Sequence, residues 1–134
     1  MIVADVNVLV YLLTDTPQRS LAKALYERDS DWRLPPLWRH ELVNVLATLT
    51  RNGVIDPQPA RQAWRNAFHL FAAGERELDL EEALSLAMES GISAYDAQYV
   101  ALAQALDTWL VSEDQRLQRS FPNRVASLGQ AIEH

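Results

Sequence analysis

Short apolar segments alternate with amphipathic ones along this chain, and that alternation limits its fold more than any other feature. The apolar segments have the length of buried strands, and the amphipathic ones have the 3.6-residue period of helices. Strands connected through helices pair in parallel, and their helices cover both faces of the sheet. The sequence therefore predicts an α/β fold in three layers, α/β/α. The central, mostly parallel sheet has about five strands, expected at residues 2–4, 33–34, 77–80, 108–111 and 124–128.

Helix-forming patterns fill the stretches between these strands. Pro17 is placed to open a helix over residues 17–31, because proline is favoured in the first turn. A long helix follows the proline pair 35–36 and runs to residue 51, where Asn52 and Gly53 are expected to cap it. Further helices are expected at residues 7–13, 56–74, 81–89 and 93–106, with a short helix from residue 114 and a helical tail.

Composition narrows the class of protein. The 134 residues fit a single domain over residues 1–134, and no repeat or linker interrupts them. The absence of cysteine excludes disulfides, thiolate nucleophiles, iron–sulfur clusters and cysteine-based zinc sites. No basic leader opens the chain and its longest apolar run, residues 8–13, is too short to span a membrane, so we expect a soluble, cytoplasmic protein. A net charge of −6 argues against binding nucleic acid by a basic surface alone.

Asp5 and Asp114 each follow a predicted strand at the point where a helix begins. An aspartate there is a common N-cap, so each taken alone has a purely structural explanation. Glu113, next to Asp114, is an alternative cap or ligand. The carboxyl ends of parallel strands share one edge of a sheet, and ligands bind at that edge. We therefore expect these aspartates to lie near each other.

Glu41 and Asp96 lie within predicted helices, on their apolar faces. Glu41 is three residues after Trp38 and four before Val45, on the stripe that these residues form. Alternatively, Glu41 lies at the edge of this stripe, where its side chain reaches water or pairs with an arginine. Asp96 is three residues after Ser93, where a capping box is the alternative explanation. Asp96 nevertheless shares a helical face with apolar residues, so it points toward the core.

Carboxylates gathered at one edge of a sheet repel one another unless cations neutralise them. An all-oxygen set of ligands suits Mg²⁺ or Mn²⁺. The sequence therefore predicts a divalent-metal site formed by Asp5, Glu41, Asp96 and Asp114.

In order and spacing these motifs resemble the PIN-domain family, and the resemblance covers nearly the whole chain. It is carried by Asp5-Val6-Asn7, Trp38-Arg39-His40-Glu41-Leu42, Ser93-Ala94-Tyr95-Asp96-Ala97 and Ser112-Glu113-Asp114. The resemblance implies metal ligands and catalytic groups at the four acids. It also implies second-shell polar residues at Asn7 and Ser112.

Single-domain PIN proteins of this size are similar to VapC toxins. That similarity implies a Mg²⁺-dependent (or Mn²⁺-dependent) endoribonuclease, the toxin of a type II pair with a VapB-like antitoxin. It further implies a homodimer, an antitoxin that covers the acidic cleft, and operator DNA bound only through the complex. No membrane partner is expected.

The expected mechanism is metal-assisted hydrolysis of RNA. One or two metal ions activate water, orient the scissile phosphate and stabilise the leaving oxygen, with Glu41 as a ligand or as the group that orients the water. Arg39 and Arg116 each lie beside a candidate acid and are candidate RNA contacts, although an ordinary solvated surface explains them equally well.

Other classes of protein also place acids at strand ends. A receiver domain needs a lysine late in the chain and a haloacid-dehalogenase-like phosphatase also needs a lysine, whereas the only lysine, Lys23, is badly placed for either. The phosphatase also needs a second aspartate where Asn7 stands. The serious alternative is a catalytically silent PIN-like docking or regulatory module that binds a protein partner. Metal-dependent RNA cleavage that is lost on Asp5→Asn or Asp96→Asn separates the two hypotheses.

Overall fold

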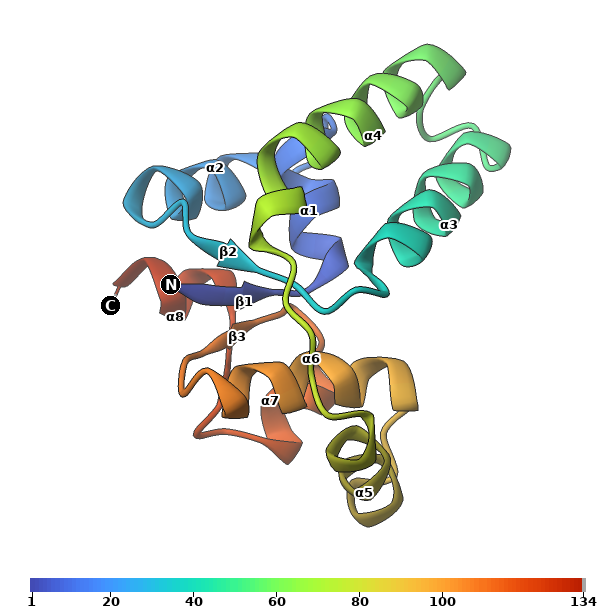
Figure 1. Cartoon of the computed structure of the whole chain (residues 1–134). Helices are drawn as coiled ribbons and strands as arrows, with labels where there is room; N and C mark the ends of the chain where they lie inside the picture. Colours follow the sequence, from blue (N-terminus) through green and yellow to red (C-terminus); the bar gives the residue numbers. More distant parts are fainter. Residues whose placement is uncertain (134) are drawn as a thin grey trace.

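A parallel sheet forms the centre of the fold in the computed structural model, which describes residues 1–133 (Figure 1). The strand order is β2-β1-β3-β4, and every neighbouring pair is parallel. All of these strands therefore end at the same edge of the sheet, and the predicted α/β architecture is confirmed. The strands are β1 (Ile2–Ala4), β2 (Trp32–Arg33), β3 (Leu110–Val111) and β4 (Val125–Ala126).

The prediction of a fifth strand at residues 77–80 is wrong, since the sheet described within residues 1–133 has four. A single parallel bridge joins Glu75 to Leu34 beside β2. The ladder stops there because the two prolines that follow Leu34 have no N–H to donate. Farther on, the Asp79 carboxylate accepts a backbone hydrogen bond at 2.9 Å and caps the helix α5 (Leu80–Ser90), so the chain turns away from the sheet.

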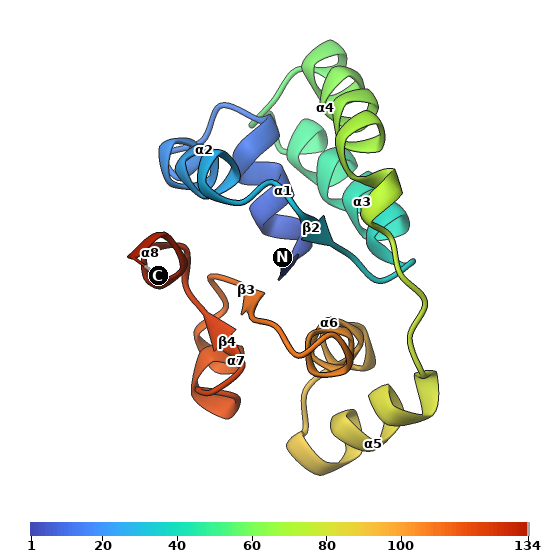
Figure 2. The same cartoon turned by 60° about the vertical axis from the view of Figure 1, so that its left-hand side comes forward.

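Helices cover both faces of the sheet, as the three-layer prediction requires (Figure 2). On one face α1 (Val6–Leu13) packs on α2 (Arg19–Arg28), and α2 packs on α8 (Leu128–Glu133). On the other face α6 (Ala94–Ala105) contacts β1 and β3 and supports α5. Each crossover therefore returns the chain to the same end of the sheet, so that the strands stay parallel.

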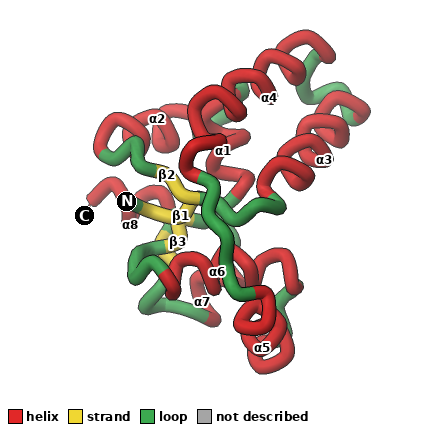
Figure 3. Tube along the Cα trace, in the orientation of Figure 1, coloured by secondary structure: helices red, strands yellow, loops and turns green. Residues whose placement is uncertain are grey.

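Two further helices form a hairpin beside α1, and a short helix joins the last two strands. The hairpin consists of α3 (Trp38–Arg51) and α4 (Pro57–Phe71), which ends in a 3₁₀ turn, Ala72–Gly74. A long loop then runs from this turn past the sheet to α5 (Figure 3). α7 (Gln115–Ser120) connects β3 to β4.

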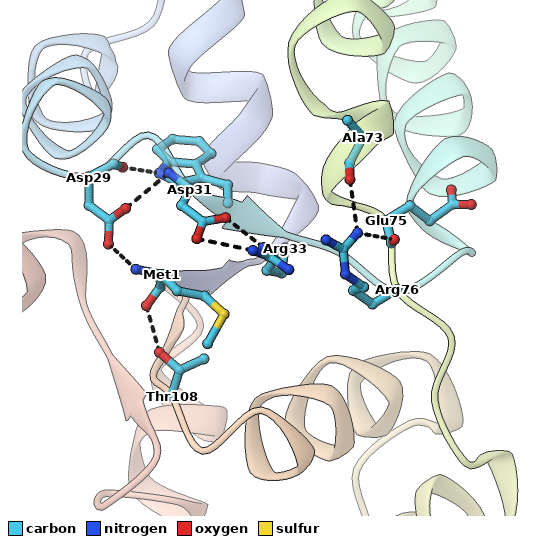
Figure 4. Close-up of polar contacts among 9 residues, drawn as sticks. Met1, Asp29, Asp31, Arg33, Ala73, Glu75, Arg76 and Thr108 are labelled. Atoms are coloured by element: carbon cyan, nitrogen blue, oxygen red, sulfur yellow. Dashed lines mark hydrogen bonds and ion pairs between the residues drawn. The ribbon is translucent and has the colours of Figure 1, made fainter.

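The loop after α4 approaches β2 very closely. A Cβ atom at Gly74 would lie 2.1 Å from the carbonyl oxygen of Trp32, so only glycine fits at this position. The Arg76 guanidinium then donates to the carbonyl oxygens of Ala73 and Glu75, each at 2.8 Å, and holds the turn (Figure 4). These contacts fix the start of the long loop against the sheet.

The first strand is held at its amino end by polar contacts (Figure 4). The terminal amine of Met1 pairs with the Asp29 carboxylate at 2.6 Å, and the Thr108 hydroxyl donates to the Met1 carbonyl oxygen at 2.6 Å. Because β1 lies between β2 and β3, these contacts help to fix its register. None of the helices described within residues 1–133 is both long and apolar enough to cross a membrane.

Candidate active site

Asp5 stands at the carboxyl end of β1, where only 8% of its surface is exposed. It occupies the N-cap position of α1, yet its side chain caps no backbone N–H. Its Oδ2 instead accepts a hydrogen bond at 2.7 Å from the Ser112 hydroxyl. Burial raises the pKa of Asp5 to about 6; the bond from Ser112 opposes this rise, whereas the nearby charges of Asp96 and Asp114 add to it.

Ser112 links the carboxyl ends of β1 and β3. It is fully buried, and its Oγ accepts a hydrogen bond from the Asp114 backbone N–H at 3.1 Å while it donates to Asp5. The Asp114 carboxylate in turn caps α7 by accepting from the Leu117 N–H at 3.1 Å. The two strand-end aspartates are therefore fixed relative to each other through one hydroxyl group.

Glu41 lies in the first turn of α3, and Tyr99 of α6 holds its carboxylate. The buried Tyr99 hydroxyl donates to Glu41 Oε1 at 2.7 Å. Burial raises the pKa of Glu41; the Tyr99 hydrogen bond opposes the rise, and the charges of Asp5 and Asp96 contribute to it. The sequence does not reveal that Tyr99 contacts Glu41. The one local sign is a tyrosine hydroxyl three residues after Asp96, on the core face of the same helix.

Asp96 lies in the first turn of α6, next to the N-cap residue Ser93. The Ser93 hydroxyl accepts a hydrogen bond from the Asp96 backbone N–H at 3.0 Å and caps the helix. Burial and the charge of Asp114 raise the pKa of Asp96, whereas hydrogen bonding by Ser93 and the charge of Arg116 oppose the rise. Arg116 is held beside this site by a 2.7 Å bond to the Gly91 carbonyl oxygen.

The four predicted acids thus form one electrostatically coupled group. Each of Asp5, Glu41 and Asp96 has its pKa raised by at least one of the others or by Asp114. No ion pair to any of these four carboxylates occurs within residues 1–133, whereas Asp29, Glu75 and other acids do have cationic partners. Asp5 is buried, Glu41 and Asp96 are half-buried, and Asp114 is exposed. A carboxylate that is buried without a cation, as Asp5 is, normally binds a metal or remains protonated.

A divalent cation fits the chemistry of these donors, which are all carboxylate oxygens. In the part of the chain that the structure describes, no three His, Asp or Glu side chains are close enough together to hold a metal ion as they stand. Metal binding would therefore require side-chain rotations within the coupled group.

The other residues singled out from the sequence lie in varied surroundings. Arg39 pairs with Glu75 at 2.7 Å, and its guanidinium lies over the ring of Phe68. Glu113 accepts a hydrogen bond from the Leu128 N–H at 2.6 Å, so its carboxylate serves the start of α8. Asn7 is exposed on the first turn of α1, and no side-chain hydrogen bond from it occurs within residues 1–133.

A hollow of about 530 Å³ opens between α3 and the start of α6, beside the coupled acids. Glu41 belongs both to the acid group and to the wall of this hollow. The other lining residues are Leu37, His40, Asn44 and Tyr95.

Comparison with known proteins assigns the chain to a family. Residues 2–120 match the PIN domain. The chain belongs to the PIN-domain family. It is 37% identical over 125 residues to Ribonuclease VapC9 of Mycobacterium tuberculosis, with 87% of this chain and 88% of that protein covered. It is 26% identical over 125 residues to Ribonuclease VapC3 of Pyrobaculum aerophilum, with 90% and 95% covered. These relatives confirm the predicted VapC type and agree with the expected nuclease class.

Two solved structures share this fold over nearly the whole chain. PAE2754 from Pyrobaculum aerophilum aligns with a TM-score of 0.79 at 21% identity, over 98% of this chain and 86% of that one. FitAcB from Neisseria gonorrhoeae aligns with a TM-score of 0.70 at 20% identity, over 96% and 99%. The PIN-domain chain therefore has the arrangement of strands and helices found in these proteins.

Proposed function

We propose that this PIN-domain chain is a divalent-metal-dependent endoribonuclease, the toxin of a VapBC-like type II toxin–antitoxin pair. The observation that carries the proposal is the coupled group of Asp5, Glu41, Asp96 and Asp114 at the carboxyl edge of the sheet, none of which forms a salt bridge among the described residues. The ribonuclease names of relatives that match most of the chain support the substrate class.

Asp5, Asp96 and Asp114 are the proposed ligands of Mg²⁺ or Mn²⁺, and Glu41 is a further ligand or orients the attacking water. A bound divalent cation supplies positive charge that polarises the scissile phosphate and lowers the pKa of water. Ser112 fixes the Asp5 carboxylate, Tyr99 fixes the Glu41 carboxylate, and each hydrogen bond leaves the second carboxylate oxygen available. Asn7 is proposed to orient Asp5 after the side-chain rotations that metal binding requires.

Arg116 is the better placed of the two candidate RNA contacts. Its charge acts on Asp96, and its bond to the Gly91 carbonyl holds it at the site. A guanidinium there is suited to a phosphate of the RNA strand. Arg39 is already paired with Glu75, so an RNA contact from Arg39 requires that ion pair to open.

The proposed partners are RNA, a VapB-like antitoxin that covers the acid group, operator DNA through that complex, and a second copy of the chain. The homodimer is supported by two complementary surfaces. The acidic helix α5 exposes Leu80, Leu84 and Met88 at helical spacing. A groove of about 630 Å³ between α3 and α4 has an apolar floor and carries two arginines, Arg61 and Arg65.

The first experiment is induced expression of the wild type and of Asp96→Asn, followed by mapping of new RNA 5′ ends. The proposal expects the wild type to arrest growth and to produce discrete new ends. Asp96→Asn should accumulate as soluble protein and produce none, because a proposed ligand is lost while the backbone N–H that the Ser93 hydroxyl caps is kept. Equal growth and no new ends, with soluble wild-type protein present, would favour the silent docking module instead.

A further inference from the structure

We propose that the hollow between α3 and α6 is a nucleobase subsite, which holds one unpaired base of the RNA stacked on Tyr95. The inference rests on the proposed ribonuclease function and deepens it, because it assigns a place to the nucleotide beside the cut. The hollow has a volume of about 530 Å³, within the range of roughly 300–1,000 Å³ usual for small-ligand sites.

Tyr95 provides the aromatic surface that stacking requires. Its side chain is 64% exposed, although it lies in a helix whose other large residues are mostly buried. Tyr95 precedes Asp96 directly, and neighbouring helical positions are about 100° apart, so the two side chains point in different directions. The exposed tyrosine ring faces the hollow while Asp96 belongs to the acid group. Aromatic side chains are the usual platforms for bases of single-stranded RNA.

The remaining walls suit a base rather than a phosphate or a metal. Leu37 supplies an apolar surface, and Asn44 supplies an exposed amide that can both donate and accept hydrogen bonds. His40 adds a further exposed polar group. Glu41 is the only carboxylate among the lining residues. An amide beside an aromatic ring matches the combination of stacking and edge recognition by which proteins bind unpaired bases.

The position of Glu41 connects the subsite to the reaction. Because this carboxylate lines the hollow and also couples to Asp5 and Asp96, a phosphate at the acids places an adjacent nucleotide at the hollow. A base in a duplex is stacked and paired and cannot enter. The subsite therefore selects RNA that is single-stranded next to the cleavage site.

The test measures RNA binding by fluorescence anisotropy with Ca²⁺ in place of Mg²⁺, so that the acids can hold a cation and a phosphate while cleavage is suppressed. The probe is a short single-stranded RNA that spans the cleavage site mapped by 5′-end sequencing. Tyr95→Ala should weaken binding about tenfold to a hundredfold, the range expected for loss of one stacked base. Tyr95→Phe keeps the ring and should bind within about twofold of the wild type. Trp109→Ala is the matched control, since Trp109 is also exposed but lies at the amino end of β3.

An abasic substitution at each position of the same RNA identifies the base. At one position the abasic substitution should weaken RNA binding by the wild type but leave binding by Tyr95→Ala unchanged, because the two changes remove the same contact. The subsite proposal is overturned if Tyr95→Ala binds the RNA as tightly as the wild type does. It is also overturned if every abasic substitution weakens binding equally in the wild type and in Tyr95→Ala. If Asp96-dependent cleavage persists in that case, the ribonuclease proposal stands and only the subsite fails. If the wild type neither cuts nor binds RNA, both proposals fail.

Discussion

A single buried carboxylate, Asp5, couples the stability of the metal-free protein to pH. Its pKa in the folded protein is about 6, against an ordinary value of 3.8, so the folded state holds the proton more tightly than the unfolded chain. Below about pH 4 Asp5 is protonated in both states and does not destabilise the fold. As the pH rises from about 4 to about 6, the free energy of unfolding falls, because the unfolded chain loses its proton first. Above about pH 6 the full destabilisation by the buried charge remains. A shift of this size corresponds to roughly 3 kcal/mol.

Asp5→Asn should remove most of this penalty. The amide oxygen can still accept the Ser112 hydrogen bond, whereas the buried charge is gone. In EDTA at about pH 7.5 we expect the variant to be more stable than the wild type by roughly 1–3 kcal/mol, with little difference near pH 4. Urea unfolding at both pH values measures this. Mg²⁺ should stabilise the wild type alone, and a variant less stable than wild type at pH 7.5 would contradict the electrostatic account.

Tyr99 should set the pH dependence of cleavage through Glu41. Its hydroxyl opposes the rise in the pKa of Glu41, so Tyr99→Phe raises that pKa further and moves the acidic limb of the rate profile to higher pH. We expect the acidic limb to move to higher pH, with the rate recovering toward wild type at alkaline pH. The measurement is kcat/KM on the mapped RNA against pH. Tyr26→Phe is the matched control, because the Tyr26 ring packs edge-on against Trp32 away from the acids.

At the scale of elements, Asp114 has two roles that substitutions can separate. It caps α7 through the Leu117 N–H, and it contributes charge to the acid group. Asp114→Asn keeps an equally good cap and removes the charge, whereas Asp114→Ala removes both. Both variants should lose cleavage, but only Asp114→Ala should lose stability, by about 1 kcal/mol. Thermal unfolding in EDTA tests this, and equal stability of the two variants would contradict a capping role.

The elements that position the site were predictable because each has a local sequence pattern. Asp5 and Asp114 were expected at neighbouring strand ends, and the structure places them there, joined by Ser112. Residues 77–80 have a strand-like pattern but form no strand. Strand pairing ends before them, at the bridge between Leu34 and Glu75, because two prolines follow Leu34. Strand pairing depends on the partner strand, which a local pattern does not contain.

Tertiary contacts determine the roles of several residues for which the sequence pattern allows more than one role. Glu113 could be a ligand or a cap in the sequence, and the approach of α8 makes it a cap for Leu128. Tyr99 donates to Glu41, which lies 58 positions away in the chain. Arg39 looked free for RNA, but the loop after α4 brings Glu75 to it. Each of these contacts joins distant segments, so the local sequence does not identify the partner.

At the scale of the whole molecule, opposite charges lie on two surfaces with exposed apolar residues. α5 carries Glu81, Glu82 and Glu89 and no basic residue, and α4 carries Arg61 and Arg65 and no acidic residue. Neither arginine pairs with a carboxylate within residues 1–133. In a two-fold dimer the α5 helix of each copy can occupy the α3–α4 groove of the other, since a self-complementary pair of surfaces closes the assembly.

Charge reversal tests this dimer directly. The pair Arg61→Glu and Arg65→Glu should raise the dimer dissociation constant at least about tenfold, because like charges then face each other across the interface. Adding Glu81→Arg and Glu82→Arg to the same chain should restore dimerisation, since the charges again oppose. Glu27→Arg, an exposed position on α2, is the matched control and should leave the dimer unchanged. Sedimentation equilibrium at low salt gives each constant. If the arginine reversal leaves the dissociation constant unchanged, the dimer forms through another surface. If the glutamate reversal restores dimerisation, α5 of one copy contacts the α3–α4 groove of the other.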